Sequence, residues 1–188
     1  MLTFILVGIA AALIALARGG SLDSLAATRL RLIPLVVIGL AVEIVFEVWR
    51  PEWLSEGAAL AILVLSDVLV LWFVLANRRT PGILLVGAGL ALNALVIALN
   101  GGMPVSDRAV QVSGAPTVEG DRLKHERLSS DTNLPWLGDV IPVPVLGEVL
   151  SIGDLVLALG IAQLVHGRTL AGRNGPRGGK VSDESRHA

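Results

Sequence analysis

Five long apolar segments follow one another along the chain, and they constrain its fold more than any other feature. They cover residues 2–17, 32–49, about 58–76, 82–99 and roughly 149–165. The mean hydropathy is +0.72, and the charged residues, 16% of the total, lie mainly between these segments. Each segment approaches the roughly 20 residues that a helix needs to cross a bilayer. The sequence therefore predicts an all-α, polytopic membrane bundle of five transmembrane helices.

The first segment could also be read as a secretory signal peptide, because Ala15-Leu16-Ala17 has the form of a cleavage site. A signal peptide carries basic residues before its apolar run, whereas the first basic residue here, Arg18, follows the run. We therefore expect a retained helix whose N-terminus lies outside the membrane.

The basic residues predict how the bundle is oriented. Ten of the fifteen Lys and Arg residues lie in the first and third connections and in the C-terminal tail. Since basic residues concentrate on the cytoplasmic side, we expect the N-terminus outside and the C-terminus in the cytoplasm. The tryptophans Trp49, Trp53 and Trp136 would then lie at the outer interface, where aromatic side chains anchor membrane proteins.

The connection over residues 101–147 is the longest in the chain and should lie outside the membrane. Unstructured loops longer than about 12–15 residues are uncommon, so we expect this one to be partly ordered. Residues 134–146 are apolar but contain three prolines, and should pack on the bundle or lie in the interface. We expect one transmembrane domain over residues 1–168 and a disordered cytoplasmic tail over residues 169–188.

Several acids and amides lie within the apolar segments, near their outer ends. Glu43 and Glu47 are four residues apart and share one helix face, as do Asn93 and Asn100, seven apart. Charged residues in membrane helices are costly and normally face the bundle interior or a cavity. The sequence therefore predicts an outward-facing, ligand-binding pocket formed by Glu43, Glu47, Asn93, Asn100 and Asp154.

Each of these residues also has a purely structural interpretation. Ser151 and Asp154 have capping-box spacing, in which both satisfy the backbone at the start of a helix. Glu47 could pair with Arg50 at the membrane edge, and Asn93 could only bridge two helices. Asn100 precedes two glycines and could simply end its helix.

The outer loop adds His125, Asp131 and Asp139 as candidates for acid–base chemistry. His125 lies in a charged run, which is more often a solvated face. The chain contains no Cys, no metal-ligand spacing of its three His residues, and neither a nucleophile-elbow nor a phosphate-loop motif. No metal site is therefore predicted, no particular cofactor is indicated, and the net charge of −1 argues against nucleic acid as a partner.

Three elements of the sequence form a recognisable set: NGGMPV at residues 100–105, LGDVIPVP at 137–144 and SIGD at 151–154. Together they resemble the bacterial membrane family catalogued as domain of unknown function 5317. The resemblance covers about residues 1–168. It implies a bacterial, multi-pass membrane protein and supplies no catalytic roles.

The leading hypothesis is thus a protein of the bacterial plasma membrane that binds or passes an ion or a small polar ligand. The alternatives are an enzyme acting on a lipid at the outer leaflet and a structural subunit with a membrane-protein partner. The enzyme hypothesis requires a groove open to lipid and His125 close to an acid. The structural hypothesis requires carboxylates that are satisfied internally.

Overall fold

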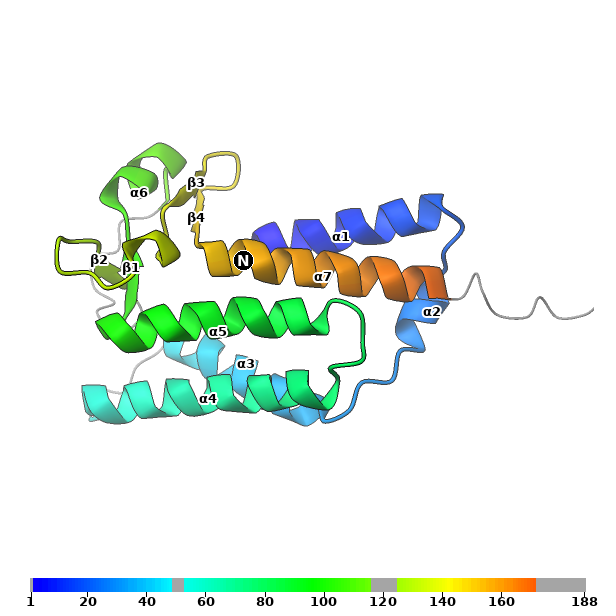
Figure 1. The fold of residues 1–188 in the computed structure, drawn as a ribbon, viewed down its shortest axis with the longest axis horizontal. Helices are drawn as coiled ribbons and strands as arrows, with labels where there is room; N and C mark the ends of the chain where they lie inside the picture. Colours follow the sequence, from blue (N-terminus) through cyan, green and yellow to red (C-terminus); the bar gives the residue numbers. More distant parts are fainter. Residues whose placement is uncertain (1, 49–52, 116–124, 172–188) are drawn as a thin grey trace, which may run out of the picture.

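Five long helices run side by side in the computed structural model, which describes residues 2–48, 53–115 and 125–171 (Figure 1). They are α1 (Leu2–Ala17), α3 (Ile33–Val48), α4 (Glu56–Ala76), α5 (Ile83–Asn100) and α7 (Ile152–Ala171). A short helix, α2 (Leu22–Ala26), follows α1. Each of the five apolar segments thus forms a helix.

The helix ends follow local sequence signals. Gly82 and Gly101 flank α5 with φ angles of 81° and 78°, a left-handed conformation that glycine adopts without strain. Helix α7 begins at Ile152, slightly later than expected, because residues 148–150 belong to a strand. It continues to Ala171, so residues 169–171 are helical rather than part of a disordered tail. The remainder of the expected tail, 172–188, lies outside the described residues.

The connection between α5 and α7 forms a small folded unit, which we call the cap, at one end of the bundle (Figure 1). It contains β1 (Met103–Val105), α6 (Asp107–Ser113), β2 (His125–Arg127), the 3₁₀ turn η1 (Pro135–Leu137), β3 (Ile141–Val143) and β4 (Glu148–Leu150). Strand β1 pairs in parallel with β2, and β3 pairs with β4 in an antiparallel hairpin. The chain is therefore mostly helical, and the all-α prediction missed four short strands.

The apolar stretch 134–146 packs on the bundle through η1, as the prolines predicted. Leu137 is 2% exposed and forms a core cluster with Val96 of α5 and Met103 of β1. Ile152, at the start of α7, also packs against this cluster. The cap is thereby joined to both α5 and α7.

Helices α5 and α7 run antiparallel and touch along a line of glycines spaced seven residues apart on each helix. Gly82, directly before α5, and Gly89 of α5 face Gly160 and Gly153 of α7, respectively. A Cβ atom built on Gly89 would lie 2.5 Å from the carbonyl oxygen of Gly153, closer than real Cβ contacts. Only glycine therefore allows the two backbones to approach this closely, as in membrane helix pairs with small residues at the interface. We call this contact the glycine seam.

Large apolar side chains point away from the helix contacts. Ile5, Leu13, Leu65 and Leu159 are each more than half exposed, while Ala11 and Ala15 are buried. So many exposed large apolar residues are unusual for a water-soluble bundle. Among the described residues, two helices, Gly57–Ala76 and Ile83–Asn100, are long and apolar enough to cross a membrane. This weakly supports membrane association, and five crossings remain a prediction.

Candidate functional site

Asn93 of α5 and the first turn of α7 meet beneath the cap and form a closed hydrogen-bond network. The side-chain amide of Asn93 donates to Asp154 Oδ1 at 2.9 Å, and the Ser151 hydroxyl donates to Asn93 Oδ1 at 2.9 Å. The backbone N–H of Ser151 donates to Asp154 Oδ2, and that of Asp154 donates to Ser151 Oγ, both at 2.9 Å. We call these three residues the polar ring.

The polar ring confirms the capping-box interpretation of Ser151 and Asp154, since each side chain accepts the other's backbone N–H. It also brings Asn93 and Asp154 together, so the capping role and the contact between the two predicted site residues coexist. Both carboxylate oxygens of Asp154 accept a hydrogen bond, and Ser151 is fully buried. The network thus fixes a carboxylate at the boundary between bundle and cap.

Asp139 brings a second carboxylate to this boundary from the cap. Its backbone N–H donates to the Pro104 carbonyl at 2.8 Å, and its own carbonyl accepts the N–H of Ser106 at 3.0 Å. These bonds hold Asp139 beside β1. Val105 of β1 forms an isolated parallel bridge with Asp139. Its Oδ1 atom is buried and has no hydrogen-bond partner among the described residues.

The surroundings of Asp139 disfavour its negative charge. Burial and, to a lesser extent, the nearby Asp154 carboxylate together raise the pKa of Asp139 from the ordinary value of 3.8 to about 7. A buried acid next to another acid holds its proton more tightly, because two negative charges repel strongly where water is excluded. The pair of Asp139 and Asp154 is therefore suited to taking up one positive charge.

Asn100 serves a different contact from the one expected. Its side chain exchanges two hydrogen bonds with the backbone of Asn133, accepting its N–H at 2.7 Å and donating to its carbonyl at 3.0 Å. The Asn100 amide also donates to the Val96 carbonyl at 2.8 Å. Asn100 thus ties the cap to the end of α5, while Asn93, seven residues earlier, belongs to the polar ring.

Of the other predicted site residues, only Asp131 has a described side chain, and its printed contact lies outside this network. Glu43 and Glu47 lie on α3, and His125 on β2, but their side chains fall outside the described residues. Asp131 is exposed and accepts a weak hydrogen bond from the Ser130 hydroxyl at 3.4 Å. Among the residues described, no group of three or more His, Cys, Asp or Glu side chains could hold a metal ion.

Glu148 is an interacting carboxylate that sequence reasoning did not identify. Its Oε1 accepts the backbone N–H of Leu2 at 2.7 Å, and its Oε2 accepts the hydroxyl of Thr3 at 2.6 Å. Glu148 therefore caps the start of α1 from 145 residues away. No short-range pattern specifies such a contact, although an acid beside an uncapped helix start is a general signal.

One comparison identifies the family that the three sequence elements resemble. The family model described as "Family of unknown function (DUF5317)" matches residues 27–166. That range contains Asn93, Asp139, Ser151 and Asp154. No curated protein and no solved structure matches the chain.

Proposed function

Since the chain belongs to the family of unknown function DUF5317, we propose its role from its own residues. We infer a bacterial protein that crosses the plasma membrane five times, with the cap outside and α7 ending in the cytoplasm. Its acid pair, Asp139 and Asp154, would bind one proton or one small cation at the outer end of the bundle. Binding there would control how firmly the cap is held on α5 and α7.

The helix packing supports the membrane part of this proposal. Helices α4 and α5 are long and apolar enough to span a bilayer. The glycine seam and the outward-facing leucines and isoleucines agree with a lipid environment. The connection between α4 and α5 carries Arg78 and Arg79, as expected for the cytoplasmic side.

The observation that carries the site is the buried Asp139 oxygen without a hydrogen-bond partner, beside a second carboxylate. A buried polar atom without a partner costs free energy, on the order of 1–3 kcal/mol. A proton on Asp139, or a cation between the two acids, would remove both this cost and the repulsion between the charges. Both carboxylate oxygens of Asp154 already accept hydrogen bonds, so Asp139 is the carboxylate that would gain the proton or the cation.

The pH dependence of stability tests the proton. The raised pKa means that folded protein binds this proton more tightly than unfolded protein does. Its stabilising contribution is complete below pH 3.8 and is lost as the pH rises to about 7. The free energy of unfolding should fall across this range by up to about 4 kcal/mol. Asp139→Asn, which mimics the protonated acid, should remove that slope and raise stability above pH 7.

Titration of the purified full-length protein with sodium and calcium salts at alkaline pH tests the cation. Wild-type protein should gain thermal stability with one of these ions, and Asp139→Asn should not. Asp131→Asn is the matched control, because Asp131 is an exposed acid of the same loop. An Asp139→Asn protein that keeps the wild-type pH slope and the wild-type ion response would contradict the proposal.

A structural or assembly subunit is the second candidate, and the polar ring favours it. All the side-chain groups of the ring that are named above find partners within the protein, as a purely structural network would. That role predicts that neither ion stabilises the wild-type protein more than it stabilises Asp139→Asn. It also predicts that the protein copurifies from its membrane with a second membrane protein.

A further inference from the structure

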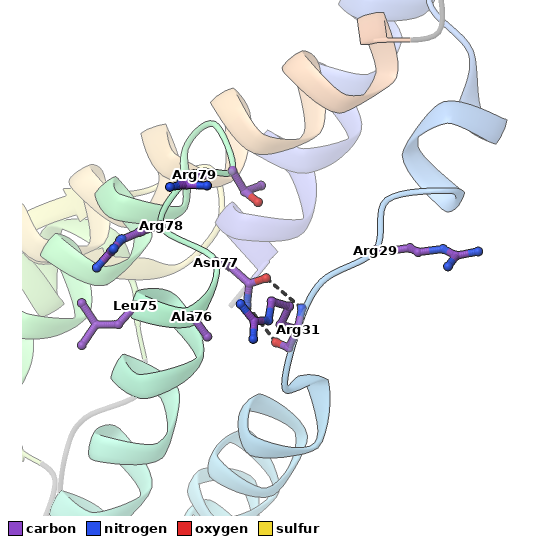
Figure 2. A pocket seen from close by; sticks show the side chains of 8 residues that line it. Arg29, Arg31, Leu75, Ala76, Asn77, Arg78 and Arg79 are labelled. Atoms are coloured by element: carbon purple, nitrogen blue, oxygen red, sulfur yellow. Dashed lines mark hydrogen bonds between the residues drawn. The ribbon is translucent and has the colours of Figure 1, made fainter.

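A pocket of about 540 Å³ opens at the end of the bundle opposite the cap. It lies between the segment that precedes α3 and the turn that joins α4 to α5, and four arginines line it: Arg29, Arg31, Arg78 and Arg79 (Figure 2). Figure 2 shows Arg31 beside Asn77. It shows Arg78 and Arg79 on the α4–α5 turn, and Arg29 extending away from that turn. Pockets of about 300–1,000 Å³ are the usual size for small-molecule sites.

The buried side chain of Asn77 holds the two walls of this pocket together. Its Oδ1 accepts the backbone N–H of Arg31 at 2.8 Å, and its Nδ2 donates to the Arg31 carbonyl at 2.8 Å (Figure 2). Leu32, the next residue, has a φ of 58°, a left-handed conformation that is strained for leucine. The backbone at Arg31 is thus fixed against the end of α4, and Arg31 lines the same pocket as the arginines of the turn.

The positive charge around this pocket is not balanced by acids within the described residues. No acidic side chain lines the pocket, and none of its four arginines forms an ion pair there. The guanidinium of Arg168 of α7 donates at 3.1 Å to the Oγ1 atom of Thr80, which lines the pocket. The Arg168 Nε atom is buried and has no hydrogen-bond partner among the described residues. Such a group of cations favours an anion, and the guanidinium fork suits phosphate.

An apolar groove of about 460 Å³ adjoins the arginine pocket on the outer face of α4. It is lined by Val68, Leu71, Trp72, Leu75 and Ala76, and the last two also line the arginine pocket. Trp72 is 61% exposed and Leu75 is 62% exposed, although both are large apolar residues. A ligand that filled both spaces would carry an anionic group at one end and an apolar chain at the other.

We propose that these two spaces together bind an anionic phospholipid. Arg31, Arg78 and Arg79 hold the phosphate of its headgroup, and an acyl chain lies in the groove along Trp72. Trp72 is four residues from the end of α4, about the depth at which tryptophan commonly meets headgroups. This inference needs the membrane location but not the acid pair at the other end of the bundle.

Native mass spectrometry of the full-length protein in a neutral detergent tests the proposal. The probes are short-chain phosphatidylglycerol, short-chain phosphatidylcholine and inorganic phosphate. Wild-type protein should bind phosphatidylglycerol more tightly than either of the others. The double substitution Arg78→Gln with Arg79→Gln should weaken that binding by roughly tenfold to a hundredfold, the effect expected for lost charge-assisted hydrogen bonds. Trp72→Ala should weaken phosphatidylglycerol binding and leave phosphate binding unchanged.

Three controls keep the outcome unambiguous. Arg108→Gln is the control for the single substitution Arg79→Gln, because it removes the same charge from an exposed arginine of the cap. Arg78→Lys with Arg79→Lys keeps the charge and the orientation signal but removes the guanidinium forks, and should also bind more weakly. Leu84→Ala on α5 removes an exposed apolar side chain outside the groove and should bind as wild type does.

Three results would overturn the assignment. Equal binding of phosphatidylcholine and phosphatidylglycerol would show that the arginines do not select an anion. Wild-type affinity in the lysine double variant would leave only general charge attraction. Phosphate binding as tight as that of phosphatidylglycerol, unaffected by Trp72→Ala, would indicate a site for a free anion instead of a lipid.

Discussion

Asp139 and Glu148 are both carboxylates of the cap, yet their surroundings shift their pKa values in opposite directions. Burial raises the pKa of Asp139 to about 7, helped by Asp154. Burial also raises that of Glu148, but hydrogen bonds, including those from Thr3 and Leu2, outweigh it and lower the pKa to about 2. The difference lies in the donors: the helix start supplies N–H groups to Glu148, whereas Asp139 Oδ1 has no donor among the described residues.

Substituting Glu148→Gln should weaken the attachment of α1. The lowered pKa means that the charge of Glu148 stabilises the fold above pH 4.5, and that this contribution is lost as the pH falls towards 2. The variant should lose roughly 0.5–1 kcal/mol of stability at neutral pH, the usual value of a carboxylate at a helix N-terminus. Its difference from wild type should vanish in acid.

Denaturant unfolding at neutral pH and at a pH near 2 measures this effect. Asp131→Asn is the matched control, since Asp131 is an exposed acid of the cap that lies outside the helices. A Glu148→Gln protein that unfolds like wild type at neutral pH would show that this carboxylate does not anchor α1.

For single residues, the sequence predicted the hydrogen-bond partners where both partners lie on regular helices. Helix periodicity and depth predicted that Asn93 and Asp154 approach each other, and the capping motif predicted how Asp154 bonds to Ser151. The partner of Asn100 is a backbone group 33 residues away in an irregular loop, and no periodicity specifies it. The raised pKa of Asp139 depends on burial by the cap, which only the folded structure reveals.

The helices show how much of the fold hydropathy alone can predict. All five long helices were placed correctly, because a long apolar run with flanking charges is a strong signal. The strands of the cap were missed, because each has only three residues and prolines at positions 104 and 142 interrupt them. The glycines of the seam were visible in the sequence, but their partners on the facing helix were not.

The glycine seam predicts that adding a single methyl group will destabilise the bundle. Gly89→Ala would place a Cβ 2.5 Å from the Gly153 carbonyl oxygen and 2.7 Å from the Leu157 nitrogen, both backbone atoms that cannot easily move. Overpacking of this kind typically costs about 1–3 kcal/mol. Equilibrium unfolding of the purified protein in mixed detergent micelles measures the change.

Gly57→Ala provides the matched control on α4, because a Cβ there would meet nothing within 4 Å. That substitution should leave stability unchanged or raise it by up to about 1 kcal/mol, since alanine favours helix more than glycine does. If Gly89→Ala and Gly57→Ala proved equally stable, the two helices could not be packed as closely as the seam implies.

In the whole molecule, the arrangement of the helices places acidic side chains at one end of the bundle and arginines at the other. The cap and the acid pair lie at one end, and Arg31, Arg78, Arg79 and Arg168 lie at the other (Figures 1 and 2). Hydropathy predicted the number of long helices but not their neighbours, since lipid-facing surfaces look alike in sequence. That α1 packs beside α7 became evident only in the structure.

The absence of cysteine from the chain makes the predicted orientation directly measurable. Val145→Cys places a thiol on the cap at a residue that is 93% exposed. Asp23→Cys places one on α2 at the opposite end. A membrane-impermeant maleimide should label the first in intact cells and the second only after the membrane is permeabilised. Labelling of Asp23→Cys in intact cells would reverse the proposed orientation.

The pairing of α1 with α7 also has a consequence for how the protein is made. Helix α1 leaves the ribosome first and α7 much later, yet α1 packs chiefly against α7 in the described structure. Its start is held by Glu148, and the Ser21 N–H just beyond its end bonds to the Thr169 carbonyl at 2.8 Å. During synthesis α1 must therefore wait without its main neighbour until translation has passed residue 169. The bundle is therefore closed by α7, which is made after α1.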